Sequence, residues 1–272
     1  MQKAFIMIAA AASVAFAAPP PAARPPLTAQ QKAAIDSIRN VYRIPGCAGT
    51  LARNAREAAA CPMAAHLDTF LTWVAGIEST TTAIGAQLDN RYKALVCDSV
   101  MAIDTAGYPA LGDPHAPVLA VLYASSLCPL CKYVLSGILA AMDGGPLAHA
   151  VRLVVKPFAG APGDRAFMAA LAMGKAWDLE RVLSHVKERT DQRVVMRIAD
   201  SIGLDTTRLK PAMNDPAVSR KLEASRDEGK RNGVSVTPGI FINRHPYHNY
   251  KDPQWVIDAL QYAVEMQKAR KR

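Results

Sequence analysis

Apolar residues recur at helical spacing through the first third of the chain. Between Thr28 and Arg43, for example, Ile35, Ile38 and Val41 fall on one side of a helix. Three later segments have the same character, and the Ile44-Pro45-Gly46 break separates the first from the rest. The pattern therefore predicts a small all-helical region over residues 28–97, with helices at 28–43, 47–60, 62–75 and 80–95.

The pattern changes to strand character after residue 98. Residues 99–103 form a short strand candidate, and residues 107–117 form a turn-rich link. Val118 to Ala124 is then continuously apolar, which is typical of a strand buried on both faces of a sheet. A predicted helix at 129–142 and a predicted strand at 151–155 complete a strand–helix–strand unit.

The remaining third returns to helix and closes with a strand and a helix. Residues 164 to about 230 are predicted to be helical in pieces divided at Asp178, Asp191, Gly203 and Asn214-Asp215-Pro216. Residues 233–243 have strand character. Asp252 suits a helix N-cap, and Pro253 suits the first helical position, so a last helix is expected from there. The fold class is α/β.

The N-terminus has the layout of a secretory signal peptide. Lys3 gives a basic start, residues 4–16 are almost wholly apolar, and Ala15-Phe16-Ala17 fits a signal-peptidase site. We predict a signal peptide at 1–17 and an extended, proline-rich linker at 18–27. An uncleaved membrane anchor is the alternative. Either reading places the folded part in the periplasm or another extracytoplasmic space, where disulfides persist.

Composition and charge exclude several classes of protein. Half of the 272 residues are hydrophobic, so the chain can form a core without many disulfide cross-links. Five cysteines are also too few for a mini-protein held together by disulfides. The net charge is +9, but aromatic residues are not interleaved with the basic ones as a single-strand nucleic-acid surface requires. No nucleic-acid partner is expected. The basic tail at 268–272 is read as a solvated helix end.

The motif that carries chemistry is Cys128-Pro129-Leu130-Cys131, directly after the buried strand. A helix N-terminus supplies free N–H groups and a partial positive charge, which lower the pKa of Cys128 and stabilise its thiolate. Cys131 lies one helical turn on, within disulfide reach, and should be the more buried of the two. The pair can open a disulfide through a mixed disulfide that the second thiol resolves, and no cofactor is needed.

Three other interpretations of the two cysteines compete with this one. A closed zinc site needs two further ligands, and no second CxxC or HxxxH motif exists in the chain, so no metal is expected. Covalent haem needs CxxCH, whereas residue 132 is lysine. A purely structural disulfide remains open, although it has little reason to follow a buried strand in such a unit.

In three segments the sequence resembles the thioredoxin superfamily and, within it, the DsbA-like periplasmic disulfide oxidoreductases. They are residues 112–118, which lead into the strand and the CPLC motif; residues 236–243, which resemble the family's cis-proline loop; and residues 250–264 at the end. The resemblance implies a thioredoxin-like domain over residues 98–268. About 100 residues separate the CPLC motif from Pro238, which leaves room for the family's helical insert at about 164–230.

The resemblance also implies roles for individual residues. Pro238 would follow a cis peptide bond beside the two cysteines, and the backbone of Thr237 would pair with an extended substrate chain; a trans proline at the start of a strand is the alternative. The chain departs from the family twice. Leu130 stands where oxidases often have histidine, and Leu122 stands where the family often has a buried acid. We therefore expect a less oxidising centre than in the strongest oxidases.

The other reactive side chains are harder to place. Cys47 and Cys61 flank one short predicted helix and are the favoured structural disulfide, while Cys97 could be free or pair with either. Lys132 is read mainly as a solvated helix residue that could lower the thiolate pKa slightly. His245 and His248 are read mainly as surface residues of a loop after the last strand.

The leading hypothesis is an exported thiol:disulfide oxidoreductase of DsbA type. Its substrates would be reduced or misoxidised exported proteins, and its electron partner would be a redox protein, for which the membrane is one location. The alternatives are an isomerase or reductase, dimeric through residues 28–96, and a redox-inactive peptide-binding or chaperone module. The sequence leaves the oligomeric state open.

Overall fold

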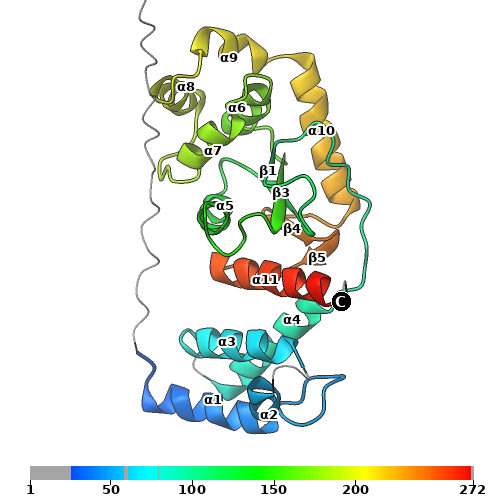
Figure 1. Cartoon of the computed structure of the whole chain (residues 1–272). Coiled ribbons are helices and arrows are strands. Elements are labelled where there is room, and N and C mark those ends of the chain that lie inside the picture. The colour runs from blue at the N-terminus through cyan, green and yellow to red at the C-terminus, as the bar shows by residue number, and fades with distance from the viewer. Residues whose placement is uncertain (1–25, 58–60, 79, 271–272) are drawn as a thin grey trace, which may run out of the picture.

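A computed structural model describes residues 26–57, 61–78 and 80–270. The signal-peptide pattern at 1–17 and most of the linker at 18–27 lie outside these ranges. Within them, no helix has both the length and the apolar character that crossing a membrane requires. The model has a five-stranded sheet with helices around it and a separate helical region at the N-terminus (Figure 1), so the predicted α/β fold class is confirmed.

The N-terminal helices pack into a small core that also contains Trp255 of the last helix. Thr28 caps the first helix in a capping box with Gln31, and Thr80 caps the fourth. Cys47 and Cys61 form a disulfide, and Cys61 lies in this core with 1% of its surface exposed. The predicted helix over residues 47–60 is wrong in its extent, because the chain turns through residues 45–49 before the short α2. The four helices are α1 (Ala29–Val41), α2 (Leu51–Arg56), α3 (Met63–Ala75) and α4 (Thr81–Leu95).

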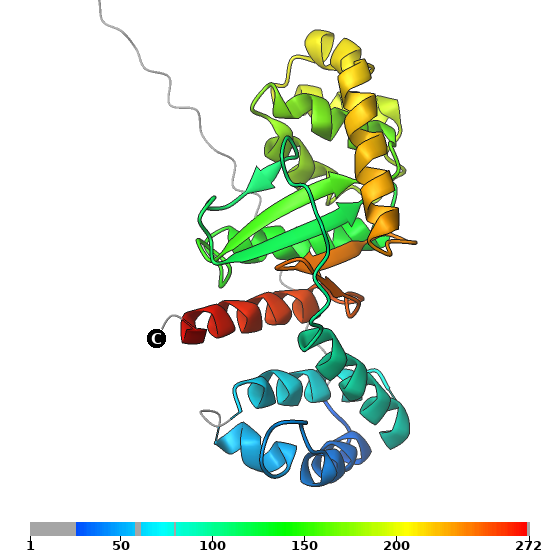
Figure 2. The ribbon, with the colours of Figure 1, turned by 90° about the vertical axis from the view of Figure 1, so that its right-hand side faces the viewer.

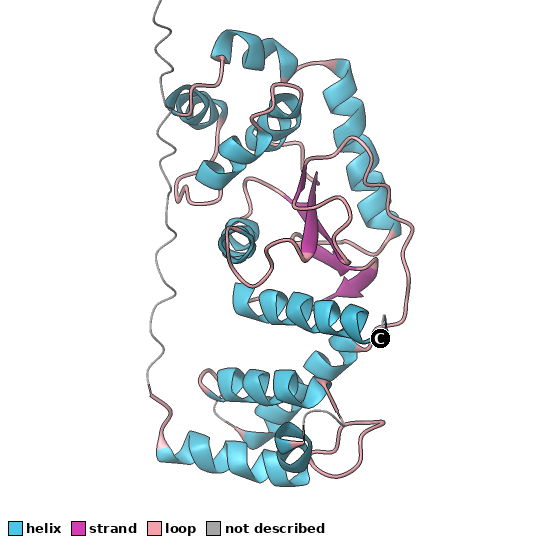
Figure 3. Ribbon diagram, in the orientation of Figure 1, coloured by secondary structure: helices cyan, strands magenta, loops and turns pink. Residues whose placement is uncertain are grey.

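The sheet occupies the middle of the larger domain (Figure 3) and has the order β1-β3-β2-β4-β5. Strands β2 and β3 run parallel, as the crossover through the intervening helix requires, and the other neighbours are antiparallel. The strands are β1 (Ala110–Leu111), β2 (Val118–Ala124), β3 (Val151–Pro157), β4 (Gly239–Ile242) and β5 (His245–Tyr247).

Helices cover the sheet on both faces (Figure 2), which explains the continuous apolar run of β2. Leu122 and its neighbours two residues away face the core under α5 (Pro129–Met142) and α11 (Pro253–Arg270). Tyr123 faces the opposite core, which α10 (Pro216–Arg231) closes. Because successive side chains of a strand point to opposite faces, a strand between two helical layers needs apolar residues at every position.

The helical insert joins β3 to the last strands. Most of it sits beyond the ends of β2 and β3, at the top of Figure 1, and α10 runs from there back along the sheet. Asp191, Asp205 and Asp215 cap three of its helices. The predicted division at Asp178 is wrong: the chain breaks at Gly174, whose φ is +69°, and Asp178 lies in the first turn of the next helix. The other helices of the insert are α6 (Pro162–Leu171), α7 (Ala176–Leu183), α8 (Gln192–Ser201) and α9 (Thr206–Ala212).

Two predicted strands differ from the structure. Residues 99–103 form no strand, because this segment crosses the outer face of the sheet and buries Ile103 there, while Val100 stays exposed. The edge strand β1 lies instead inside the segment read as a turn-rich link. The strand predicted over residues 233–243 is shorter, since only residues 239–242 pair with β2. His245 lies in β5 rather than in a loop.

A buried polar cluster joins the N-terminal helices to the larger domain. Arg91 on α4 is fully buried, and its guanidinium donates hydrogen bonds to the Asp258 carboxylate and the Tyr247 hydroxyl, and to the Trp255 carbonyl oxygen at 2.9 Å. His66 on α3 meets the other oxygen of Asp258 at 2.7 Å. Burial lowers the pKa of His66, but the two carboxylates beside it outweigh burial and raise it overall.

Candidate active site

The chain between β2 and α5 places Cys128 at a helix start. After Ala124 a three-residue turn leads to Cys128, which is the N-cap of α5, and Pro129 occupies the first turn. The backbone N–H of Cys131 donates to the Cys128 sulfur at 3.1 Å. Cys128 is half-buried, whereas Cys131 is only 2% exposed and both thiols are free. Cys128 is therefore the sulfur that another molecule can reach.

The two thiols have opposite acidities. The pKa of Cys128 is lowered to about 6, and the largest cause is a hydrogen bond from the Cys131 thiol. Two backbone N–H groups and the Thr237 side chain lower this pKa further, whereas burial raises it. The same hydrogen bond and burial raise the pKa of Cys131 well above that of a free thiol. The helix start thus holds one sulfur ready to ionise and the other protonated.

The loop before β4 meets this pair from across the sheet. Because β4 is antiparallel to β2, the start of β4 lies beside the end of β2, and Thr237 reaches Cys128 although 109 residues separate them. The Cys128 thiol donates to the Thr237 carbonyl oxygen at 3.5 Å. The Thr237–Pro238 peptide bond is cis. Leu130, between the two cysteines, is half-buried and packs against the main core.

Alkylation of the reduced protein should reveal the acidity of Cys128. As the pH rises through the pKa the thiolate fraction grows, so the iodoacetamide reaction at Cys128 should reach half its maximal rate near pH 6. The measurement follows the mass of the Cys128 peptide against pH, in a Cys97→Ser background that removes the other half-buried free thiol. A midpoint near the ordinary thiol value of about 8.5 would contradict this acidity.

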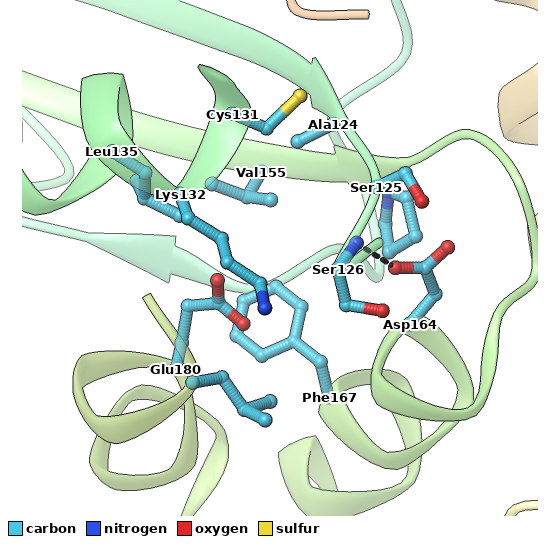
Figure 4. A pocket seen from close by; sticks show the side chains of 12 residues that line it. Ala124, Ser125, Ser126, Cys131, Lys132, Leu135, Val155, Asp164, Phe167 and Glu180 are labelled. Carbon is cyan, nitrogen blue, oxygen red and sulfur yellow. Dashed lines mark hydrogen bonds between the residues drawn. The ribbon is translucent and has the colours of Figure 1, made fainter. Parts of the chain in front are cut away.

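A small cavity of about 20 Å³ lies behind Cys131 (Figure 4). Its wall contains three charged side chains from three helices: Lys132 of α5, Asp164 of α6 and Glu180 of α7. Figure 4 shows the Glu180 carboxyl and the Lys132 ammonium facing each other, with Asp164 on the Ser126 side. Asp164 accepts backbone hydrogen bonds from Ser126 at 2.7 Å and from Ala161 at 3.0 Å. Such a cavity has room for one water molecule.

Burial sets the protonation of the two carboxyls. It raises the pKa of Glu180 to about 8; repulsion from Asp164 adds to this, and attraction by Lys132 opposes it. Burial also raises the pKa of Asp164, against the hydrogen bonds that it accepts. Glu180 is consequently a buried acid that changes its charge near neutral pH.

Lys132 is not the solvated helix residue that its sequence suggests. Its ammonium donates to the Val186 carbonyl at 3.0 Å and to the Thr190 hydroxyl at 2.7 Å. Both partners belong to the loop between α7 and α8. Lys132 therefore ties the helix that carries the two cysteines to the helical insert.

Sequence reasoning missed Glu180 and Asp164 as neighbours of Cys131. A signal for Glu180 exists: it lies four residues after Ala176 and three before Leu183, on the buried side of α7. A glutamate on an apolar helical face is unusual and points to a buried acid. Leu122, in contrast, is buried among apolar residues of the core, as its sequence position implied.

The remaining candidate residues lie elsewhere. The Cys47–Cys61 disulfide belongs to the N-terminal core, and Cys97 is a half-buried free thiol after α4. His248 is exposed, and His245 is half-buried in β5. In the part of the chain that the structure describes, no three His, Cys, Asp or Glu side chains are grouped so as to hold a metal ion.

Comparison with known proteins gives one family and a set of similar structures. The Thioredoxin family model matches residues 104–261. A thioredoxin-like oxidoreductase from Silicibacter pomeroyi is 26% identical, with a TM-score of 0.52 over 61% of this chain and 94% of that one. BdbD from Bacillus subtilis, in its oxidised form, is 19% identical, with a TM-score of 0.53 over 61% and 97%.

A third similar structure is α-DsbA1 from Wolbachia pipientis, which is 15% identical with a TM-score of 0.54 over 63% of this chain and 97% of that one. These three structures cover almost the whole of their own chains but less than two thirds of this one. No curated protein matches the sequence.

Proposed function

The chain is a thiol–disulfide oxidoreductase of the thioredoxin family, and on that premise we propose that it oxidises dithiols in exported proteins through Cys128 and Cys131. The observation that carries the proposal is the pKa of Cys128, which is lowered to about 6 at the start of α5. A stabilised thiolate stabilises the reduced, dithiol form of the centre. A centre whose reduced form is stable accepts electrons readily and is therefore oxidising.

The proposed reaction begins with the disulfide form of the centre. A substrate thiolate attacks the Cys128 sulfur and expels Cys131, which leaves a mixed disulfide between substrate and Cys128. A second substrate thiolate then attacks the substrate sulfur and releases Cys128 as a thiolate. The substrate gives up two electrons and gains a disulfide, and the centre becomes a dithiol. We propose that a redox partner protein restores its disulfide.

The surface around Cys128 supports a polypeptide substrate. Leu127, Tyr133 and Val236 are large exposed apolar residues in the segments that carry the CPLC motif and the cis-proline loop. The backbone at Thr237 lies beside the Cys128 sulfur, where an extended chain could form strand-type hydrogen bonds. In this proposal Thr237 and Pro238 hold the substrate, while Pro129 and Leu130 shape the space between the two sulfurs.

Export is part of the proposal. The N-terminal pattern of a signal peptide at 1–17 supports it, and so does the Cys47–Cys61 disulfide, because structural disulfides persist mainly outside the cytoplasm. An extracytoplasmic oxidase would meet newly exported chains with their cysteines still reduced.

The reduction potential of the Cys128–Cys131 couple tests the direction of electron flow. A pKa near 6 lies between those of the thioredoxin and DsbA thiols, so the potential should fall between about −270 mV and about −120 mV. The measurement equilibrates the mature protein with glutathione buffers and counts free thiols. A potential at or below about −270 mV would overturn the oxidase and favour a reductase.

Leu130→His provides an internal check on this reasoning. A histidine at position 130 can donate a hydrogen bond to the Cys128 thiolate, which leucine cannot. The variant should therefore be more oxidising than the natural protein, and Leu130→Ala should remain close to it. Equal reduction potentials in the natural protein and the two variants would show that thiolate stabilisation does not set the direction of electron flow.

A further inference from the structure

His66 on α3 is buried between two carboxylates of the last helix. Its Nδ1 atom lies 2.7 Å from the Asp258 carboxylate, and its Nε2 atom lies 3.1 Å from the Glu265 carboxylate. A neutral imidazole has only one N–H group, so it can donate to one carboxylate and must turn an unprotonated nitrogen toward the other. The imidazolium ion donates to both. The two contacts of His66 therefore fit its charged form.

The charges around His66 favour the same form. The Arg91 guanidinium from α4 binds the second oxygen of Asp258 and is always charged. A charged His66 gives the cluster two cations against two carboxylates, whereas a neutral His66 leaves an excess negative charge. His66, Arg91 and Asp258 are all buried, where an unbalanced charge is costly. Burial alone lowers the pKa of His66, but hydrogen bonds and attraction from the two carboxylates raise it overall.

The other elements packed against α3 add no ion pair to this cluster in the part of the chain that the structure describes. The Tyr262 ring of α11 contacts the His66 ring edge-on, and burial raises the pKa of its phenol. The ion pairs that α1 and α2 form do not involve His66. The charged groups that face His66 are therefore Asp258, Glu265 and, through Asp258, Arg91.

The cluster connects two parts of the molecule. His66 and Arg91 belong to the N-terminal helices, whereas Asp258 and Glu265 belong to α11. Helix α11 packs against both α3 and α5, the helix that carries Cys131, and lies between them in Figure 1. A change in the charge of His66 therefore acts on the contact between the N-terminal helices and the larger domain.

We propose that His66 is a pH-sensitive latch, which holds the N-terminal helices on α11 while its imidazole is charged and loosens them when the imidazole is neutral. The latch is separate from the proposed function, since none of its residues takes part in disulfide exchange. A histidine whose pKa is raised in the folded state stabilises that state fully below its ordinary pKa of 6.5. This contribution is lost as the pH rises through the raised pKa, so the contact should loosen on the alkaline side.

The test begins with an NMR titration of the purified protein in its disulfide form. The Cε1–H signal of His66, assigned by its absence in His66→Gln, should titrate with a midpoint above 6.5. Hydrogen exchange of peptides from α3 and α11, followed by mass spectrometry, then measures how often their contact opens. At each pH the natural protein is compared with His66→Gln, so that the intrinsic exchange rate cancels.

The two measurements must agree. The natural protein should be protected more than His66→Gln at a pH well below 6.5, and the ratio of the two protections should fall as the pH rises past the midpoint. The fall should be about tenfold for each pH unit by which the midpoint exceeds the ordinary value. Peptides from β2, in the middle of the sheet, are the internal reference and should keep a constant ratio.

Two further variants complete the test. His248→Gln makes the same change at an exposed histidine before α11 and should behave like the natural protein. Glu265→Gln removes one of the two carboxylates at a side chain that is 55% exposed, so the fold should tolerate it. It should lower the midpoint of His66 and reduce the dependence of protection on pH. It also replaces His66→Gln as the test should that variant fail to fold.

The opposite results would overturn the latch. A His66 midpoint at or below 6.5 would mean that burial outweighs the two carboxylates. A protection ratio that does not change with pH would show that His66 contributes only packing. A ratio that changes equally in β2 and in α3 would show an effect on the whole fold rather than on this contact. The proposed function stands apart from all three, because it fails or holds on the reduction potential of the Cys128–Cys131 couple.

Discussion

A Cys128→Ser protein should oxidise a peptide dithiol at least about 10³-fold more slowly than the natural protein, because the hydroxyl that replaces the reacting thiol cannot form a disulfide. Cys131→Ala should lose turnover equally but for a different reason: it cannot form the Cys128–Cys131 disulfide that accepts the peptide's electrons. Its Cys128 thiolate can still attack a partner's disulfide, and the mixed disulfide then persists because Cys131 is not there to resolve it. The activity is measured as the rate of disulfide formation in a reduced peptide, and trapping as a covalent complex that reductant releases.

Cys97→Ser is the matched control, because Cys97 is also a free, half-buried thiol but lines a different pocket, beside Lys93 and Trp255. It should keep full activity and trap nothing. A Cys128→Ser protein that still acts on its clients without forming mixed disulfides would instead identify a peptide-binding module that has no redox role.

Arg91→Met should lower the free energy of unfolding by about 3–5 kcal/mol, the usual cost of breaking a buried ion pair by removing one partner. Arg91 has no exposed surface, and its loss leaves the Asp258 carboxylate buried with only His66 beside it. It also removes hydrogen bonds to Tyr247 and Trp255 that hold α4 against the larger domain. Urea unfolding at neutral pH, followed by circular dichroism, measures the change.

The comparison is Arg53→Met in the same helical region. Arg53 and Glu57 form an exposed pair, with side chains 64% and 56% exposed, so breaking it should cost less than about 1 kcal/mol. Equal losses in the two variants would mean that the buried cluster contributes no more than a surface pair, and that apolar contacts alone join the two parts.

The elements next to the CPLC motif could be predicted from the sequence because local signals decide them. The strand at residues 118–124 and the helix at 129–142 have the predicted bounds. A continuous apolar run of strand length, followed by a cysteine and a proline, allows few other structures. The helical insert also follows from local signals, since aspartate caps begin three of its helices.

Other features depend on contacts between distant parts of the chain. Residues 99–103 have strand character, but residues 110–111 take the place beside β3, and residues 99–103 cross the sheet face instead. Glu180 and Cys131 are 49 residues apart in the sequence, and only the packing of α7 against α5 brings both to one cavity. Sequence periodicity could identify Glu180 as buried, but not name its neighbour.

The insert thus changes how the replacement of an acid by leucine at position 122 is understood. From the sequence alone, the strand that leads to the CPLC motif offers Cys131 no carboxyl to exchange a proton with, because position 122 is leucine. In the structure Leu122 packs in the core, and a carboxyl from α7, that of Glu180, lies in the wall of a cavity that Cys131 also lines.

We expect the N-terminal Cys47–Cys61 disulfide to be inert, in contrast to the disulfide that the proposed reaction forms between Cys128 and Cys131. Attack on the Cys47 sulfur would have to expel Cys61 as a thiolate into an apolar core where 1% of its surface meets solvent. A buried thiolate is a poor leaving group unless hydrogen bonds stabilise it, as those from the Ser125 backbone and Thr237 do for the equally buried Cys131, whose pKa they lower. We therefore expect this bond to stay intact when two copies of the enzyme meet, so that a pool of molecules carrying a reactive centre keeps its own structural disulfide.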